Sequence, residues 1–185
     1  MNMNESIFIR KEQEIDKEEI DSLYLSSFGP GRYAKSAFRY REKYDHILDI
    51  SQVLIHQNTL IGTIRFWNIC VNNENSLLLG PIAMHRDFRG QGYGMELLKN
   101  SIMNCKNHGH NLIILVGDLS YYSKVGFKRI VPKKISFEGP VNFERVLYIE
   151  FNKSIIEDDL DFYPVSKIVN NPKNNDENCL KEISL

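Results

Sequence analysis

Three glycines in five residues, at positions 90, 92 and 94, are the feature of this sequence best suited to chemistry. They stand in the run Arg89-Gly90-Gln91-Gly92-Tyr93-Gly94, and a helical pattern follows. Backbone N–H groups at a helix N-terminus have no intrahelical partner, and the helix dipole makes that end partly positive. Glycines add no Cβ atoms that would keep an anion from these donors. The run therefore predicts an anion-binding loop, with Arg89 as a fixed positive charge at its rim.

Two common phosphate-binding motifs do not fit this run. A P-loop needs Lys followed by Ser or Thr after its last glycine, where this chain has Met95-Glu96. The dinucleotide fingerprint, counted from Gly90, needs a glycine at position 95, and it usually opens the first strand–helix–strand unit instead of standing mid-chain. From these six residues alone, a plain strand-to-helix turn with glycines for close packing stays open.

A strand before the loop and a helix after it must position these groups. Leu77 to Met84 is apolar with strand character, and Gly80-Pro81 within it is typical of a bulge or a freed edge. Helical spacing of apolar residues follows the glycines. Further strands are expected at 6–10, 51–56, 60–71, 112–116, 130–137 and 143–151, with helices at 16–28 and from about 119. This order predicts an α/β fold with an α+β mixed sheet of about seven strands and helices on both faces.

The composition is that of an ordinary soluble globular protein. The 185 residues carry a net charge of −1 and are 42% hydrophobic, which favours one domain and points to neither nucleic acid nor membrane. Residues 154–185 include seven acidic residues and three lysines. Residues 1–153 therefore carry a mild excess of positive charge, which suits a polyanionic ligand. The N-terminal residues lack the apolar core typical of a signal peptide, so we expect the protein to be located in the cytoplasm.

A second motif follows the central apolar strand, Tyr122-Ser123-Lys124-Val125-Gly126-Phe127. With Arg89 to Gly94, this tyrosine four residues before Gly-Phe resembles the GNAT N-acetyltransferase superfamily, which uses acetyl-CoA. Several short sequence runs resemble a bacterial YhbS-like subgroup of predicted N-acetyltransferases more closely than the superfamily in general. These runs are residues 27–30, 65–67, 79–85, 116–118 with 121–122, and 161–164. The resemblance covers about residues 6 to 165. We therefore expect a GNAT domain at 1–165 and a polar extension at 166–185.

The resemblance implies a role for each matching residue. The GNAT acyl-CoA N-acyltransferase fold has a splay between its fourth and fifth strands, where Ile82, Ala83 and Met84 would offer backbone groups to the pantetheine amides. Arg89, Gly90, Gln91, Gly92, Tyr93 and Gly94 would bind the pyrophosphate. Tyr122 would be the general acid that protonates the departing CoA thiolate, and Lys124 would reach a cofactor phosphate. No metal is implied.

Acetyl transfer from a thioester to an amine needs the amine deprotonated, the reactants aligned and a proton supplied to sulfur. A tyrosine keeps its proton at neutral pH and suits the last task. A cysteine nucleophile is disfavoured, because Cys70 and Cys105 fall on predicted core faces and Cys179 lies near the C-terminus. The base stays open between Asp118, His85 and a chain of water molecules.

The acceptor is expected to be a small-molecule or protein amine. An aromatic and basic segment at 32–44 is either a solvated amphipathic helix or a cover over the active site. On the second interpretation the substrate pocket comprises Phe28, Arg32, Tyr33, Trp67 and Asp118. The alternative to an enzyme is a non-catalytic acyl-CoA-binding sensor or scaffold, which needs the loop but not Tyr122. Relatives often dimerise, so a homodimer also stays open.

Overall fold

The computed structural model describes residues 7–29, 44–71, 74–130, 134–136, 141–152, 154–156 and 159–164. In these ranges a mixed sheet carries the core, and its strands are β1 (Ile7–Lys11), β2 (Gln52–His56), β3 (Thr59–Val71), β4 (Glu74–Met84), β5 (Leu112–Val116), β6 (Lys128–Arg129), β7 (Lys134–Ser136), β8 (Val146–Glu150) and β9 (Asp159–Pro164). The main path runs β1-β2-β3-β4-β5-β8-β6, seven strands, while β9 pairs with β3 and β7 with β9. The predicted fold class, with about seven strands in a mixed sheet, is confirmed.

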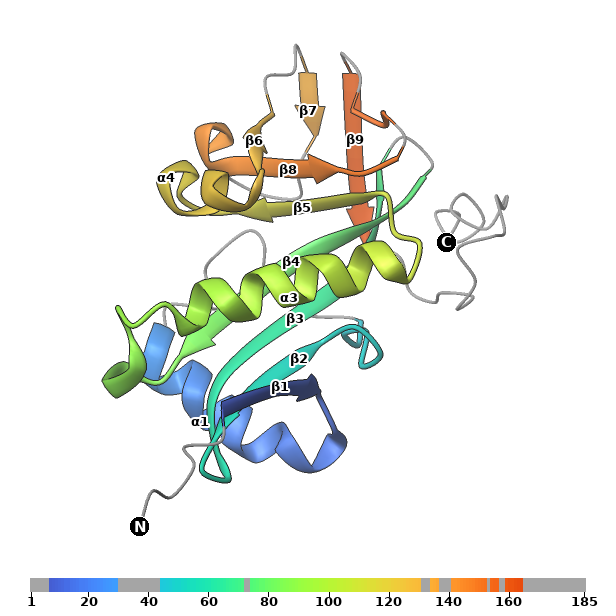
Figure 1. Cartoon of the computed structure of the whole chain (residues 1–185). Coiled ribbons are helices and arrows are strands. Elements are labelled where there is room, and N and C mark those ends of the chain that lie inside the picture. Colours follow the sequence, from blue (N-terminus) through green and yellow to red (C-terminus); the bar gives the residue numbers. More distant parts are fainter. Residues whose placement is uncertain are drawn as a thin grey trace.

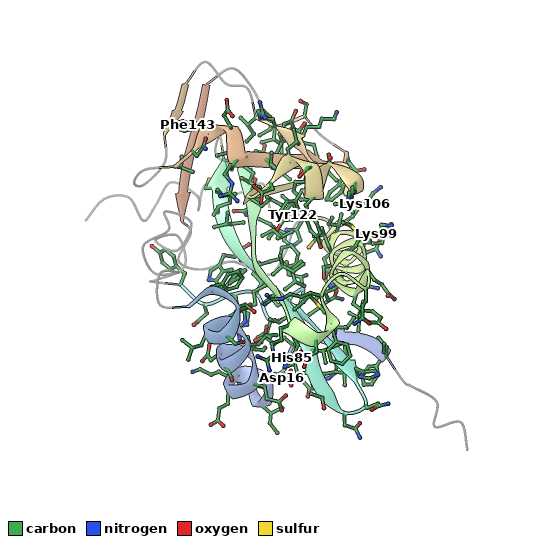
Figure 2. The ribbon with its side chains drawn as sticks, turned by 90° about the vertical axis from the view of Figure 1, so that its left-hand side faces the viewer. Asp16, His85, Lys99, Lys106, Tyr122 and Phe143 are labelled. Atoms are coloured by element: carbon green, nitrogen blue, oxygen red, sulfur yellow. The ribbon has the colours of Figure 1, made fainter. Side chains whose placement is uncertain are left out.

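Helices lie on both faces of the sheet, as Figures 1 and 2 show. The described α-helices are α1 (Lys17–Phe28), α3 (Tyr93–Asn107) and α4 (Leu119–Tyr122), and the 3-10 turns are η1 (Glu14–Asp16), η3 (Arg86–Phe88), η4 (Ser123–Val125) and η5 (Phe143–Arg145). Helix α3 buries Leu97, Leu98 and Ile102 against one face. Helix α1 buries Ile20, Leu23 and Tyr24 against the other face. None of the helices in the described ranges is long and apolar enough to cross a membrane.

Strand β3 is the longest, and all of its residues after Thr59 are buried. It is antiparallel to β2 and β4 along its length and to β9 at its end. Its register with β4 shifts between Ile64 and Phe66, which pair with Ile82 and Leu79. A bulge therefore sets Arg65 opposite Gly80-Pro81 of β4.

The parallel pair of β4 and β5 is short. Leu77 pairs with Ile113 and Leu78 with Ile114, and beyond these residues β4 pairs only with β3 while β5 pairs with β8. Figure 1 shows the two strands diverging from their point of contact. The divergence follows from the sequence, because the next residues of β4 are Gly80-Pro81, and proline has no N–H to donate to a ladder. This is the splay predicted between the fourth and fifth strands.

Two sequence expectations differ from the structure. The segment after β5 was expected as one strand at 130–137, but β6 ends at Arg129 and β7 begins at Lys134. No strand was expected after residue 153, yet β9 (Asp159–Pro164) pairs with the end of β3. The predicted segment at 32–44 lies outside the described residues except for Tyr44, and the extension at 166–185 lies wholly outside them.

Candidate functional site

The glycine loop joins η3 to α3 in a conformation that needs glycine twice. Gly90 has φ 78° and Gly92 has φ 93°, in the left-handed region that side chains with a Cβ disfavour. The carbonyl of Gly92, the N-cap of α3, accepts the N–H groups of Met95 and Glu96 at 2.9 and 3.0 Å. Among the described residues, the N–H groups of positions 90–94 find no acceptor. Donors of this kind at a helix start are the groups that hold an anion.

The space around the loop also fits a bound group. A Cβ atom built on Gly90 or Gly92 meets nothing within 4 Å, so the space beside these two residues is open. At Gly94 a Cβ would lie 3.2 Å from both Met84 Cγ and Tyr121 Oη. The first two glycines are therefore needed for backbone conformation, and Gly94 for close packing between α3, β4 and α4. A pyrophosphate fits this arrangement, because it needs several N–H donors and free volume in front of them.

Arg89 holds the loop in place. Its Nε donates to the carbonyl oxygen of Met84 at 2.9 Å, and one terminal nitrogen donates to Ser27 Oγ at 2.9 Å. Gln91 adds a third tether, from its side-chain amide to the carbonyl oxygen of Asp87 at 2.8 Å. The guanidinium thus joins the loop to the end of β4 and to α1. A direct contact of Arg89 with phosphate stays a prediction.

Residues Ile82, Ala83 and Met84 form the part of β4 that lies beyond the divergence. They pair with Ile64, Thr63 and Gly62 of β3 along one edge. On the other edge, no described strand pairs with them. Since a strand presents backbone groups along both edges, this one has polar groups to offer a ligand lying between β4 and β5.

Tyr122 lies on the β5 side of the divergence. Helix α4 begins directly after β5, and the N–H of Tyr122 donates to the carbonyl oxygen of Asp118 at 3.2 Å. Its half-buried ring packs edge-on against Tyr121 and Phe127, at centroid distances of 5.1 and 5.8 Å. Figure 2 shows Tyr122 in the half of the molecule that holds β5, and His85 in the other half, after the end of β4.

Tyr121 is a site residue to which the sequence assigned no role. Its hydroxyl lies over the first turn of α3 beside Gly94 and Met84, as the glycine geometry shows. Burial raises the pKa of this phenol, so the hydroxyl is a neutral donor. The only signal in the sequence was the doubled tyrosine, and the spacing to Gly-Phe singled out the second of the pair.

Of the predicted substrate-pocket residues, the three that the structure describes come from different elements, α1, β3 and the end of β5. Phe28 ends α1, with its ring 6.1 Å from that of Tyr24. Trp67 is buried, and its Nε1 donates to the carbonyl oxygen of Tyr44 at 3.1 Å. Asp118 is exposed at the end of β5, 3.1 Å from an Arg145 nitrogen. Arg32 and Tyr33 lie outside the described residues.

The structure also shows the surroundings of three further residues considered from the sequence: a phosphate contact, a base and a cysteine nucleophile. Lys124 is exposed on η4. His85 is half-buried, and its Nδ1 accepts the N–H of Asp87 at 3.5 Å. The Cys105 thiol is fully buried, and burial raises its pKa strongly, so it is kept protonated and away from the loop's open side. The described ranges hold no group of three His, Cys, Asp or Glu residues placed to bind a metal ion.

Comparison with known proteins decides the family. A family profile described as the Acetyltransferase (GNAT) domain matches residues 48–129, which span β2 to β6 and include both the loop and Tyr122. Escherichia coli YhbS, named as an uncharacterized N-acetyltransferase, is 30% identical over 125 residues, which are 66% of this chain and 74% of YhbS. The chain belongs to the GNAT acetyltransferase family.

Solved structures of GNAT proteins have the same fold. The crystal structure of Escherichia coli YhbS in complex with CoA aligns with a TM-score of 0.72 and 21% identity, over 88% of this chain and 93% of that one. A GNAT family acetyltransferase from Brucella melitensis in complex with acetyl-CoA aligns with a TM-score of 0.64 and 22% identity, over 85% of this chain and 96% of that one. The GNAT fold predicted from the two motifs is confirmed.

Proposed function

We propose that this GNAT protein transfers the acetyl group of acetyl-CoA directly to a primary amine of a small molecule or protein, with Tyr122 as general acid. The observation that carries the proposal is the arrangement around the divergence of β4 and β5. Unpaired N–H donors of the glycine loop lie beyond the end of β4, and Tyr122 lies at the end of β5. A donor with an anionic end and a reactive thioester end matches that arrangement.

The cofactor would follow the β4 side of the divergence. The N–H groups of residues 90–94 would bind the pyrophosphate, and the open edge formed by Ile82, Ala83 and Met84 would pair with the pantetheine amides. Tyr121 Oη, beside Gly94, would donate to the same end of the cofactor. Lys124 is exposed on the neighbouring turn and would reach a phosphate.

The reaction then needs one proton for the leaving sulfur and the removal of one proton from the amine nitrogen. The neutral amine attacks the thioester carbon, a C–N bond forms and the C–S bond breaks. The leaving thiolate takes the phenolic proton of Tyr122, which regains a proton from solvent, and the amine nitrogen releases one proton to solvent as the amide forms. General acid catalysis of this kind is worth about a hundredfold or more in rate. A covalent route through Cys105 is less suited, since its thiol is buried and protonated.

The test combines cofactor binding with acceptor profiling. Isothermal titration should show one CoA site per chain, and thiol release from acetyl-CoA should rise with one class of primary amine. Lys99→Ala is a suitable control, because Lys99 is exposed on the outer face of α3 (Figure 2) and should leave both measurements unchanged. Binding of CoA without transfer to any amine would favour the sensor or scaffold alternative. Absence of CoA binding would contradict both.

A further inference from the structure

A buried charged cluster, defined here as Glu12, Arg65 and His46, lies on the α1 face of the sheet. Arg65 donates hydrogen bonds to the Glu12 carboxylate from Nε, at 2.9 and 3.0 Å, and from a terminal nitrogen at 2.6 Å. His46 Nε2 lies 2.9 Å from the same carboxylate. These residues come from the loop after β1, the segment before β2 and the bulge of β3. Three separate parts of the chain thus meet at one carboxylate.

The cluster is held in one arrangement. The Glu12 side chain is 2% exposed and that of His46 is 19% exposed. Burial alone would raise the pKa of Glu12, but the hydrogen bonds of His46 and Arg65 outweigh it and hold that pKa below its usual range. Glu12 therefore stays ionised, and because a carboxylate only accepts hydrogen bonds, Nε2 of His46 is the donor in this contact. Nδ1, which has no partner in the described ranges, is then the free basic nitrogen.

The position of the cluster relates it to the reaction. Arg65 stands at the bulge opposite Gly80-Pro81, where β4 leaves β5, and its guanidinium carbon lies 5.4 Å from the centre of the Tyr24 ring. Tyr24 Oη lies 3.4 Å from the carbonyl oxygen of Pro81. The His46 ring is 5.6 Å from that of Trp67, whose partner on β4 is Leu78. The cluster thus flanks the divergence from the α1 face, whereas α3 packs on the opposite face.

We propose that His46, positioned by Glu12 and Arg65, accepts the proton from the acceptor amine in an acceptor site on the α1 face. The inference rests on the proposed function and deepens it. The ammonium form of the acceptor gives a proton to Nδ1, and the neutral amine attacks the thioester carbon. His46 then passes its proton to solvent, and Tyr122 supplies the proton that sulfur needs and regains one from solvent. The amine nitrogen releases its second proton to solvent as the amide forms. The net reaction converts an ammonium and a thioester into an amide, a thiol and one released proton.

The two bases expected from the sequence are less suited to this task. The Asp118 side chain is 72% exposed and forms an ion pair with Arg145. The Nδ1 lone pair of His85 is occupied by the N–H of Asp87. His46 combines partial burial, a buried carboxylate partner and a free nitrogen. This is the arrangement by which a carboxylate orients an imidazole base.

Charged groups face His46 from several elements. Glu12 and Arg65 face it from the loop after β1 and from β3, Asp45 is its exposed neighbour in the chain, and Asp21 of α1 acts on Arg65. Because Arg65 offsets the charge of Glu12, the net charge next to the imidazole is close to zero.

The first test measures transfer to 2-phenylethylamine as a function of pH, with His46→Gln and the exposed control His108→Gln. Glutamine keeps a donor toward Glu12 but cannot accept a proton. We expect kcat/KM to fall at least ~100-fold in His46→Gln and the acidic limb of the pH profile to disappear, with CoA affinity and Tm unchanged. His108→Gln should match the parent. A His46→Gln enzyme with rates within threefold of the parent and the same acidic limb would overturn the proposal.

The second test needs no turnover, so it separates this inference from the proposed function. In the CoA-bound parent protein, the His46 ring signals are assigned by proximity to Trp67, the single tryptophan of the chain. We expect 2-phenylethylamine to shift the His46 signals and leave those of His108 in place. Unmoved His46 signals at saturating amine would overturn the inference, even if the parent proves active. A shift without transfer would support the acceptor site and contradict acetyl transfer to this amine.

Discussion

The ring of Tyr122 lies directly on the backbone of Gly117, five residues earlier in the chain. A Cβ atom on Gly117 would overlap the Cε2 and Cδ2 atoms of that ring. Gly117 directly follows β5, and its N–H donates to the carbonyl oxygen of Arg145 at 2.8 Å, so its own position is fixed. The glycine therefore sets where the phenol stands relative to the divergence of β4 and β5.

Gly117→Ala should displace the Tyr122 ring. We expect kcat for acetyl transfer to fall about tenfold or more, because an ångström-scale misplacement of a catalytic group is costly, while the Kd for CoA changes little. Steady-state kinetics and titration calorimetry would measure both. Ser123→Ala, on the exposed turn that follows, is the matched control. Equal kcat values for Gly117→Ala and the parent would show that the ring position does not limit the reaction.

Tyr122→Phe keeps the ring contacts with Gly117, Tyr121 and Phe127 and removes only the hydroxyl. We expect kcat to fall by about a hundredfold with the Kd for CoA retained, because the thiolate then leaves without a proton donor. Stopped-time thiol-release assays would measure the effect. Tyr148→Phe on β8 is the control for loss of a phenol elsewhere in the sheet. Full activity in Tyr122→Phe would remove Tyr122 from the mechanism.

Gly92→Ala should separate the conformational role of the loop from its binding role. A Cβ at φ 93° is strained, and we expect a loss of about 1–2 kcal/mol in the free energy of unfolding together with weaker CoA binding. Gly109→Ala, at φ 85° after the far end of α3, is the matched control. It should lose similar stability in urea unfolding while binding CoA normally. Equal CoA affinity in the two variants would contradict the loop as the anion site.

The pair formed by Arg10 and Asp16 should make stability depend on pH. Arg10 donates to both carboxylate oxygens of Asp16 at 2.7 Å, and these bonds hold the pKa of Asp16 below its usual range against the opposing effect of burial. A carboxyl whose pKa is lower in the folded state stabilises the folded protein at pH values above its unfolded-state pKa, which is near ~3.9. This contribution to the free energy of unfolding is lost as the pH falls through the folded-state pKa. Asp16→Asn should therefore cost about 1–2 kcal/mol at pH 7.

Urea unfolding at pH 7 and below pH 3 would check this expectation. The difference between the parent and Asp16→Asn should shrink at the lower pH, because the carboxyl is protonated in the unfolded parent there and its stabilising contribution falls as pH approaches the lowered folded-state pKa. Asp49→Asn removes the exposed partner of Lys11 and should change stability by less than about 0.5 kcal/mol at either pH. A constant difference for Asp16→Asn across this range would show that its effect is not electrostatic.

The parts of the site that the sequence predicted are those encoded locally. The glycine loop needs its three glycines within five residues, and Tyr122 stands at a fixed spacing from Gly-Phe, so each is readable in one short run. The divergence of β4 and β5 was likewise signalled by Gly80-Pro81, because these residues within a strand are typical of a bulge or a freed edge. Most strands were also predictable, since buried strands are continuous apolar runs.

The parts that were missed depend on contacts between distant segments. Glu12, His46 and Arg65 meet only after folding, and nothing near any of them in the chain marks the other two. Strand β9 was missed for the same reason, because it is a strand only by pairing with β3 and β7. Tyr121 was passed over since its role depends on its distance from Gly94, which no spacing along the chain reveals.

The donors that we propose for the anion are main-chain N–H groups of the loop, and Arg89 is engaged with Met84 and Ser27. Reagents that modify arginine should therefore leave most of the affinity for CoA intact. For the same reason, proteins that bind CoA in this way need not share charged side chains in the loop, as long as the glycines keep this backbone shape. A search for cofactor-binding relatives by shared charged side chains would overlook them, whereas a search by backbone angles would not.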